Sequence, residues 1–92
     1  MKIKIDKNRN NQYLITINNK IQTKHSVLLT DEVYNKLTNG NKSKEELLYF
    51  SFNFLLEREP NTQILSQFEL SAITDYFPEY YLTIRKWCKF EL

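Results

Sequence analysis

The chain has 92 residues and a net charge of +2, from 13 basic and 11 acidic side chains. Its one cysteine, Cys88, excludes an internal disulfide, and Cys88 and the one histidine, His25, are too few for a self-contained zinc site. The length predicts a single domain, 1–92, and six Phe, six Tyr and one Trp supply enough bulk to fill a small core.

The first third of the chain predicts β-strands. Residues 2–5 alternate charged and apolar side chains, 7–11 form a polar turn, and 12–17 are rich in β-formers. The asparagines at 18–19 suit a tight hairpin, because Asn tolerates positive φ. Residues 20–29 alternate again, which predicts a three-stranded antiparallel meander with one packed face. The predicted inward-facing residues of its last strand are Ile21, Thr23, His25, Val27 and Leu29.

After Thr30 the spacing of apolar residues changes from the alternation typical of a strand to the spacing typical of a helix. Thr30 is the predicted N-cap, and Asp31 and Glu32 occupy the first turn, where the helix dipole favours acidic side chains. Asn39 and Gly40 predict the end of this helix, because glycine readily adopts the left-handed conformation that follows a helix.

A longer helix is predicted to begin at Ser43, which forms a capping box with Glu46. Residues 47–56 are apolar except Ser51 and Asn53, so this helix must be covered nearly all round. We expect it to lie at the centre of the fold. The sheet would cover one side, and the C-terminal helices or a second subunit would cover the other.

Shorter elements are predicted beyond Pro60, which cannot continue the helix. Asn61 or Thr62 would cap a short turn over 63–68.

Ser71 would cap a helix over 72–77, and Pro78 would open the last helix, over 78–90. The predicted fold class is therefore α+β. An N-terminal three-stranded antiparallel meander (1–29) packs on three to four C-terminal helices (30–92).

Charge is distributed unevenly along the chain. Residues 1–44 carry nine Lys or Arg against three acids, which gives +6, and residues 45–92 carry four against eight, which gives −4. The basic half could face nucleic acid or an acidic protein. Alternatively, the two halves attract each other within the fold or between two copies of the chain.

Catalytic chemistry finds little support in the sequence. No Ser, Cys or Asp stands at a known catalytic spacing from His25, and we interpret His25 as a strand histidine and Cys88 as a core residue. With Gly40 as the one glycine, a glycine-rich phosphate loop is excluded. We therefore expect no enzyme activity, no cofactor and no metal.

Glu57, Arg58 and Glu59 follow the apolar helix. Two carboxylates around a guanidinium could form an acid/base pair, but successive helical positions diverge by about 100° around the axis. We favour a structural role, in which Arg58 hydrogen-bonds carbonyls at the helix C-terminus or pairs with Asp75 or Glu79.

Residues 75–81 contain four aromatic side chains. On the surface they could stack on bases or anchor a protein partner. Buried, they would close a small core around a helix–proline–helix corner. We favour burial, because a domain of this size needs the apolar area.

Residues 21–59 resemble the ribbon–helix–helix regulators in plan, with a strand, a short helix and a longer helix that opens with Ser-x-x-Glu. In that family a dimer inserts two strands into the DNA major groove. The resemblance implies Gln22, Lys24 and Ser26 as base readers. However, the strand follows a hairpin turn, so we expect it to be paired already.

A second resemblance rests on the strings FLLEREP, IL, FxL and YFPEY. They are similar to a pattern in a family of short bacterial proteins of unknown function. The matching residues are Phe54 to Pro60, Ile64, Leu65, Phe68, Leu70 and Tyr76 to Tyr80. The resemblance implies a cytoplasmic bacterial protein and brings no activity, cofactor or catalytic residue.

The sequence predicts a small non-enzymatic binding or adaptor protein with a protein partner. The alternative is a dimeric DNA-binding regulator, and a homodimer fits either function. We expect a cytoplasmic protein without a membrane partner, because no signal peptide or long apolar run is present. The candidate binding surface is Lys2, Lys4, Lys20, Gln22, Lys24 and Ser26. The candidate structural or contact motif is Arg58, Glu59, Pro60, Tyr76, Phe77, Pro78 and Glu79.

Overall fold

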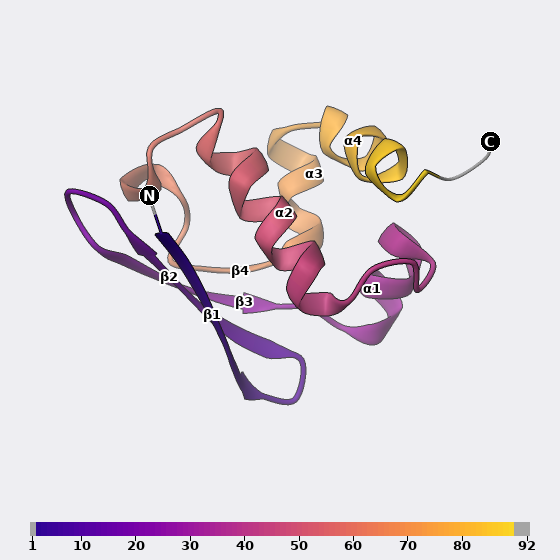
Figure 1. Ribbon diagram of the computed structural model, residues 1–92, viewed down its shortest axis with the longest axis horizontal. Coiled ribbons are helices and arrows are strands. Elements are labelled where there is room, and N and C mark those ends of the chain that lie inside the picture. The colour runs from indigo at the N-terminus through magenta and orange to yellow at the C-terminus, as the bar shows by residue number, and fades with distance from the viewer. Residues whose placement is uncertain (1, 90–92) are drawn as a thin grey trace.

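The computed structural model describes residues 2–89 as a four-stranded sheet with helix α2 (Lys44–Leu56) packed on one face (Figure 1). The strands lie in the order β1-β2-β3-β4 and span Lys2–Arg9, Gln12–Asn18, Thr23–Leu28 and Gln67–Glu69. The first three pair antiparallel, and β4 pairs parallel with β3. The predicted α+β class and the N-terminal meander are confirmed.

The fourth strand corrects the turn predicted over 63–68. Phe68 of β4 lies opposite Val27 of β3, and one residue on each side is also paired. Parallel pairing needs a crossover, which here runs through helix α1 (Asp31–Thr38) and α2. A strand of three residues is too short for its alternation to be recognised in a sequence. The region 30–92 therefore contributes to the sheet as well as supplying helices.

Both hairpin connections differ from the prediction. β1 continues to Arg9, so the turn narrows to residues 10–11, with Asn11 at φ 59°. The β2–β3 loop is longer than the two-residue turn predicted at 18–19, because Ile17 pairs directly with Thr23. Ile21 therefore lies in this loop and is 62 % exposed, so its predicted inward orientation is wrong. The other predicted inward-facing residues are buried or half-buried: Thr23, His25, Val27 and Leu29.

The helical elements follow β3. They are α1 (Asp31–Thr38), α2 (Lys44–Leu56), the 3-10 turns η1 (Asn61–Gln63) and η2 (Leu70–Ala72), α3 (Ile73–Tyr76) and α4 (Glu79–Cys88). The predicted N-cap Thr30 and the capping box of Ser43 with Glu46 are both present. α1 ends at Asn39, with φ 51°, and Gly40 follows at φ 76°. Within residues 2–89 no helix combines the length and the apolar character that crossing a membrane requires.

Other predicted helix boundaries need correction. The side chain of Asn61 does not cap η1. Ser71 does not cap α3 either, because its hydroxyl donates a hydrogen bond to the Glu69 carboxylate. Pro78 directly precedes α4 and has helical backbone angles, close to the prediction. Phe90, the end of the predicted last helix, lies outside the described residues.

Helix α2 is the central element, as predicted. Its buried residues are Leu47, Leu48, Ser51, Phe52, Phe54 and Leu55. Toward the sheet, the Phe52 ring lies 5.6 Å from the ring of His25 in β3 and 6.0 Å from that of Phe68 in β4. On another side, the Phe54 ring lies 5.1 Å from the ring of Tyr80 in α4. The sheet and the later helices therefore cover α2 within one chain.

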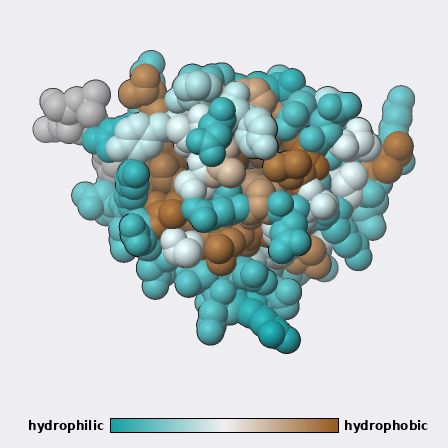
Figure 2. Space-filling model, turned by 180° about the vertical axis from the view of Figure 1, so that it is seen from behind, coloured by the Kyte–Doolittle hydropathy of each residue, from teal (hydrophilic) through white to brown (hydrophobic). Residues whose placement is uncertain are grey.

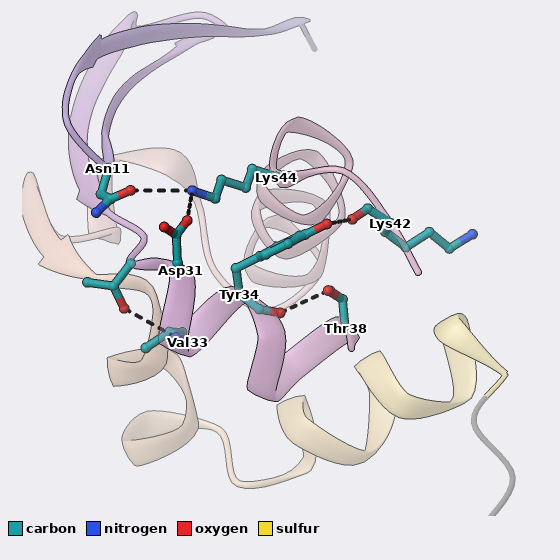
Figure 3. A network of polar contacts seen from close by, with 8 residues as sticks. Asn11, Asp31, Val33, Tyr34, Thr38, Lys42 and Lys44 are labelled. Atoms are coloured by element: carbon teal, nitrogen blue, oxygen red, sulfur yellow. Dashed lines mark hydrogen bonds and ion pairs between the residues drawn. The ribbon is translucent and has the colours of Figure 1, made fainter. Parts of the chain in front are cut away.

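A polar network fixes the starts of α1 and α2 against the first hairpin (Figure 3). The ammonium of Lys44 pairs with the Asp31 carboxylate and donates to Asn11 Oδ1 at 3.3 Å. The Asp31–Lys44 hydrogen bond raises the pKa of Lys44 and lowers that of Asp31. The Tyr34 hydroxyl donates to the backbone carbonyl of Lys42 in the α1–α2 connection. These charged groups therefore have a structural role.

Candidate functional site

The face of the sheet opposite α2 carries four of the six predicted binding residues: Lys2, Lys4, Lys24 and Ser26. The strand register places Thr16 between Lys4 and Lys24. Lys20 and Gln22 lie outside these strands, in the β2–β3 loop. The structure thus brings three lysines to one open sheet face and separates the two loop residues from them. Charge there is partly offset, because Asp6 lies 3.9 Å from the Lys4 ammonium.

Strand β3 lies inside the sheet, with β2 on one side and β4 on the other. The backbone of Lys24 and Ser26 is therefore not part of a free two-stranded ribbon. Gln22, the third predicted base reader, precedes the strand. Inserting β3 into a major groove as one of a pair of dimer strands would require the loss of a neighbouring strand. The expectation that this strand is already paired is confirmed.

Arg58 closes a corner between the end of α2 and the start of α4. Its Nη1 donates to the Phe54 carbonyl at 2.9 Å, and its Nε donates to Glu79 Oε2 at 3.2 Å. The guanidinium carbon lies 3.5 Å from the centre of the Phe54 ring. A hydrogen bond from the backbone N–H of Glu79, followed by that from Arg58, lowers the pKa of the Glu79 carboxyl. The predicted hydrogen bond from Arg58 to a carbonyl at the end of α2 is present, and so is the predicted pairing with a carboxylate, which is that of Glu79.

Replacing Arg58 with alanine is expected to lower the free energy of unfolding by about 1–2 kcal/mol. The variant loses a charge-assisted hydrogen bond to a helix carbonyl and the packing of the guanidinium on Phe54. Arg58→Lys keeps the charge but lacks the planar guanidinium. Its melting temperature should therefore lie between those of the wild type and Arg58→Ala. Unchanged stability together with loss of partner binding would instead identify Arg58 as a contact residue.

An apolar pocket of about 140 Å³ opens beside this corner. We call it the corner pocket. Its apolar walls come from Leu55, Ile64, Phe68, Ile73 and Phe77. Leu65 and Tyr76 also line the pocket and are 49 % and 65 % exposed. Figure 2, which shows the molecule from behind, has apolar groups at the surface in the middle of that face, among polar ones.

The polar residues of the corner pocket are few. Glu59 and Gln63 contribute to its lining. Of the predicted contact motif, Glu59, Tyr76 and Phe77 therefore come together here, while Arg58 and Glu79 meet at the neighbouring corner. Pro60 lies between the two places in the chain, because α2 ends at Leu56 and Pro60 directly precedes η1.

A chain of hydrogen bonds holds one side of the pocket against β3. His25 Nδ1 lies 2.7 Å from the Leu65 carbonyl, and Nε2 lies 2.9 Å from Thr23 Oγ1. Because a carbonyl can only accept, Nδ1 carries a hydrogen, and in the neutral imidazole Nε2 then accepts one from Thr23. Asn61 Nδ2 donates to Thr23 Oγ1 at 2.8 Å and to the Ile21 carbonyl at 2.9 Å. His25, 2 % exposed, therefore positions the backbone beside the pocket.

The aromatic residues of 75–81 divide between core and surface. Tyr80 is fully buried, and its hydroxyl is hydrogen-bonded to Ser51. Burial raises the pKa of Tyr80, with the Ser51 hydrogen bond opposing it. Phe77 and Tyr81 are half-buried, and Tyr76 is exposed. The predicted burial therefore holds for Tyr80, is partial for two residues and is wrong for Tyr76.

Sequence reasoning did not assign Ile64, Leu65 or Ile73 to a site. The first two belong to the strings that carry the bacterial-family resemblance, which was the one signal that pointed to them. Their role in a pocket depends on β4 pairing with β3, which the sequence pattern did not reveal.

The described residues offer little for other chemistry. Within 2–89 no three His, Cys, Asp or Glu side chains are grouped so that they could hold a metal ion. Cys88 is buried, and burial raises the pKa of its thiol, which disfavours the reactive thiolate. The corner pocket is therefore a candidate site for recognition. Comparisons of the chain with models of known families, with curated proteins and with solved structures gave no match.

Proposed function

We propose that this protein is a small non-enzymatic binding protein that captures an apolar side chain of a protein partner in the corner pocket. The observation that carries the proposal is an open apolar pocket beside two large exposed apolar residues, Leu65 and Tyr76. Exposed apolar patches and aromatic side chains are enriched where proteins bind one another. Most of the binding energy in such contacts comes from a few anchors seated in pockets.

The size and polarity of the pocket define the ligand. A volume of about 140 Å³ is close to that of an apolar cavity that holds benzene, about 150 Å³, so one leucine, isoleucine or phenylalanine side chain suits it. Glu59 supplies a carboxylate in the same lining. A partner segment with an apolar anchor next to Lys or Arg therefore satisfies both features.

The proposal is tested by titrating the labelled full chain with short peptides, each carrying one central Leu, Ile or Phe flanked by lysines. Amide resonances of Ile64, Leu65 and Tyr76 should shift. Leu65→Ser should weaken binding about tenfold, because it removes apolar surface from the entrance to the pocket without adding a charge that the peptide lysines could meet. Leu82→Ser is the matched control: Leu82 is 56 % exposed on α4 and does not line the pocket.

Two results would contradict the proposal. One is the absence of shifts with every peptide, and the other is equal weakening by the two leucine substitutions.

The DNA-binding alternative is examined with a duplex titration, in which the shifts should instead fall on Lys2, Lys4 and Lys24 and affinity should drop steeply with salt. A tagged pull-down, run with and without nuclease, then separates a protein partner from a nucleic acid.

A further inference from the structure

The β2–β3 loop presents an apolar side chain of the kind that the corner pocket suits. Ile21 is 62 % exposed although it is a large aliphatic residue. Its carbonyl accepts a hydrogen bond from Asn61 at 2.9 Å, so the loop is tied to η1. Figure 1 shows the loop and η1 at the same end of the molecule, at the left of the view. Ile21 is thus held in position on the surface.

η1 links the loop to the pocket. Asn61, which holds the loop, begins η1, and Gln63 at the end of η1 lines the pocket, followed by Ile64. Ile21 does not fill the pocket of its own chain, because it is exposed and absent from the lining. A surface that carries a projecting side chain next to a matching hollow can pair with itself about a two-fold axis, each copy filling the other.

Charge favours the same pairing. Lys20 adjoins Ile21, whereas Glu59 lines the pocket and Asp75 stands next to Tyr76. Within residues 2–89, Lys20 and Glu59 take part in no ion pair. Arg58 is engaged by Glu57 and Glu79, so its charge is already offset. The basic loop of one copy therefore complements the acidic residue in the pocket lining of another.

We infer that the partner is a second copy of this chain, and that the protein forms a two-fold dimer in which Ile21 of each copy enters the corner pocket of the other. The Lys20 ammonium approaches the Glu59 carboxylate across the interface. This inference rests on the proposed function, because it uses the same pocket. It also gives the opposite charges of the two halves of the chain a role between molecules.

Sedimentation equilibrium of the full chain over a concentration series tests the inference. The wild type should pass from one to two chain masses as concentration rises, and the dissociation constant should increase with salt. Ile21→Ser, Lys20→Glu and Glu59→Lys should each raise the dissociation constant about tenfold or more. Lys36→Glu and Leu82→Ser, which change exposed residues elsewhere, should leave it unchanged. Thermal melts establish that every variant is folded.

A charge exchange makes the test specific. An equimolar mixture of Lys20→Glu and Glu59→Lys should regain the wild-type dissociation constant. The mixed dimer has two contacts between position 20 of one copy and position 59 of the other. At one contact the two substituted side chains meet with their charges exchanged, and at the other an unaltered Lys20 meets an unaltered Glu59.

Two results overturn the inference. One is a wild type that stays monomeric up to a concentration of about 1 mM, which would place any dissociation constant above that value. The other is a dimer that Ile21→Ser and Glu59→Lys leave intact. A monomer whose pocket still binds the lysine-flanked peptides would overturn self-association while supporting the proposed function.

Discussion

Replacing Phe52 with alanine is expected to lower the free energy of unfolding by about 3–5 kcal/mol. The Phe52 side chain is fully buried, and its ring packs against His25 of β3 and Phe68 of β4. The substitution removes the apolar contact between α2 and two strands and leaves a cavity, because the surrounding backbone cannot collapse completely. A loss of this size is a large part of the total stability of a small domain, about 5–15 kcal/mol.

Urea unfolding followed by far-UV circular dichroism measures this change. Tyr49→Ala is the matched control, since Tyr49 is an aromatic residue on the same helix and is 53 % exposed. It should change stability by no more than about 0.5 kcal/mol. Equal losses from the two variants would mean that α2 is not held on the sheet by its Phe52 side. The central place of α2 in the fold would then be wrong.

Asn61→Ala is expected to lower the free energy of unfolding by about 2–3 kcal/mol. Asn61 is 4 % exposed, and its amide supplies hydrogen bonds to the Ile21 carbonyl and to Thr23 Oγ1. Without the amide, both oxygens lose a donor that the buried Asn61 side chain supplies. The Thr23 hydroxyl also loses a contact that orients it toward His25. The effect should therefore extend from the β2–β3 loop to the backbone of Leu65.

Thermal and urea unfolding give the size of this loss, and amide hydrogen exchange gives its location. Exchange should accelerate in residues 19–24 and at 65–66, while the hairpin of β1 and β2 keeps its protection. Asn53→Ala is the control, because Asn53 is exposed on α2 and alanine favours a helix. An Asn61→Ala variant as stable as the wild type would mean that water replaces the amide, and that η1 does not position the loop.

The elements that could be predicted depend on neighbours in the sequence. Thr30 and Ser43 cap helices because the hydrogen-bond partners of their hydroxyls lie three residues further along the chain. The alternation of β2 and β3 and the nearly all-apolar surface of α2 are likewise visible in short windows. For Arg58, the sequence indicated the kinds of contact, but not which carboxylate would be reached.

The corner pocket and its surroundings depend on contacts between distant residues. Asn61 meets Ile21, and His25 meets Leu65, each across 40 positions of the chain. The sequence pattern predicted that Ile21 faces inward from a strand and that Asn61 or Thr62 caps a short turn, because local patterns carry no information about such pairings.

By itself, the sequence determined the α+β class, the helix caps and the central place of α2, since local hydrogen bonding and apolar spacing decide these. Tertiary structure alone decided that β4 joins the sheet beside β3, that Ile21 projects from a loop, and that Leu65 and Tyr76 flank an apolar pocket. The physical reason is that a three-residue strand and the hollow beside it have no stability of their own. They exist because α2 brings the chain back across the sheet.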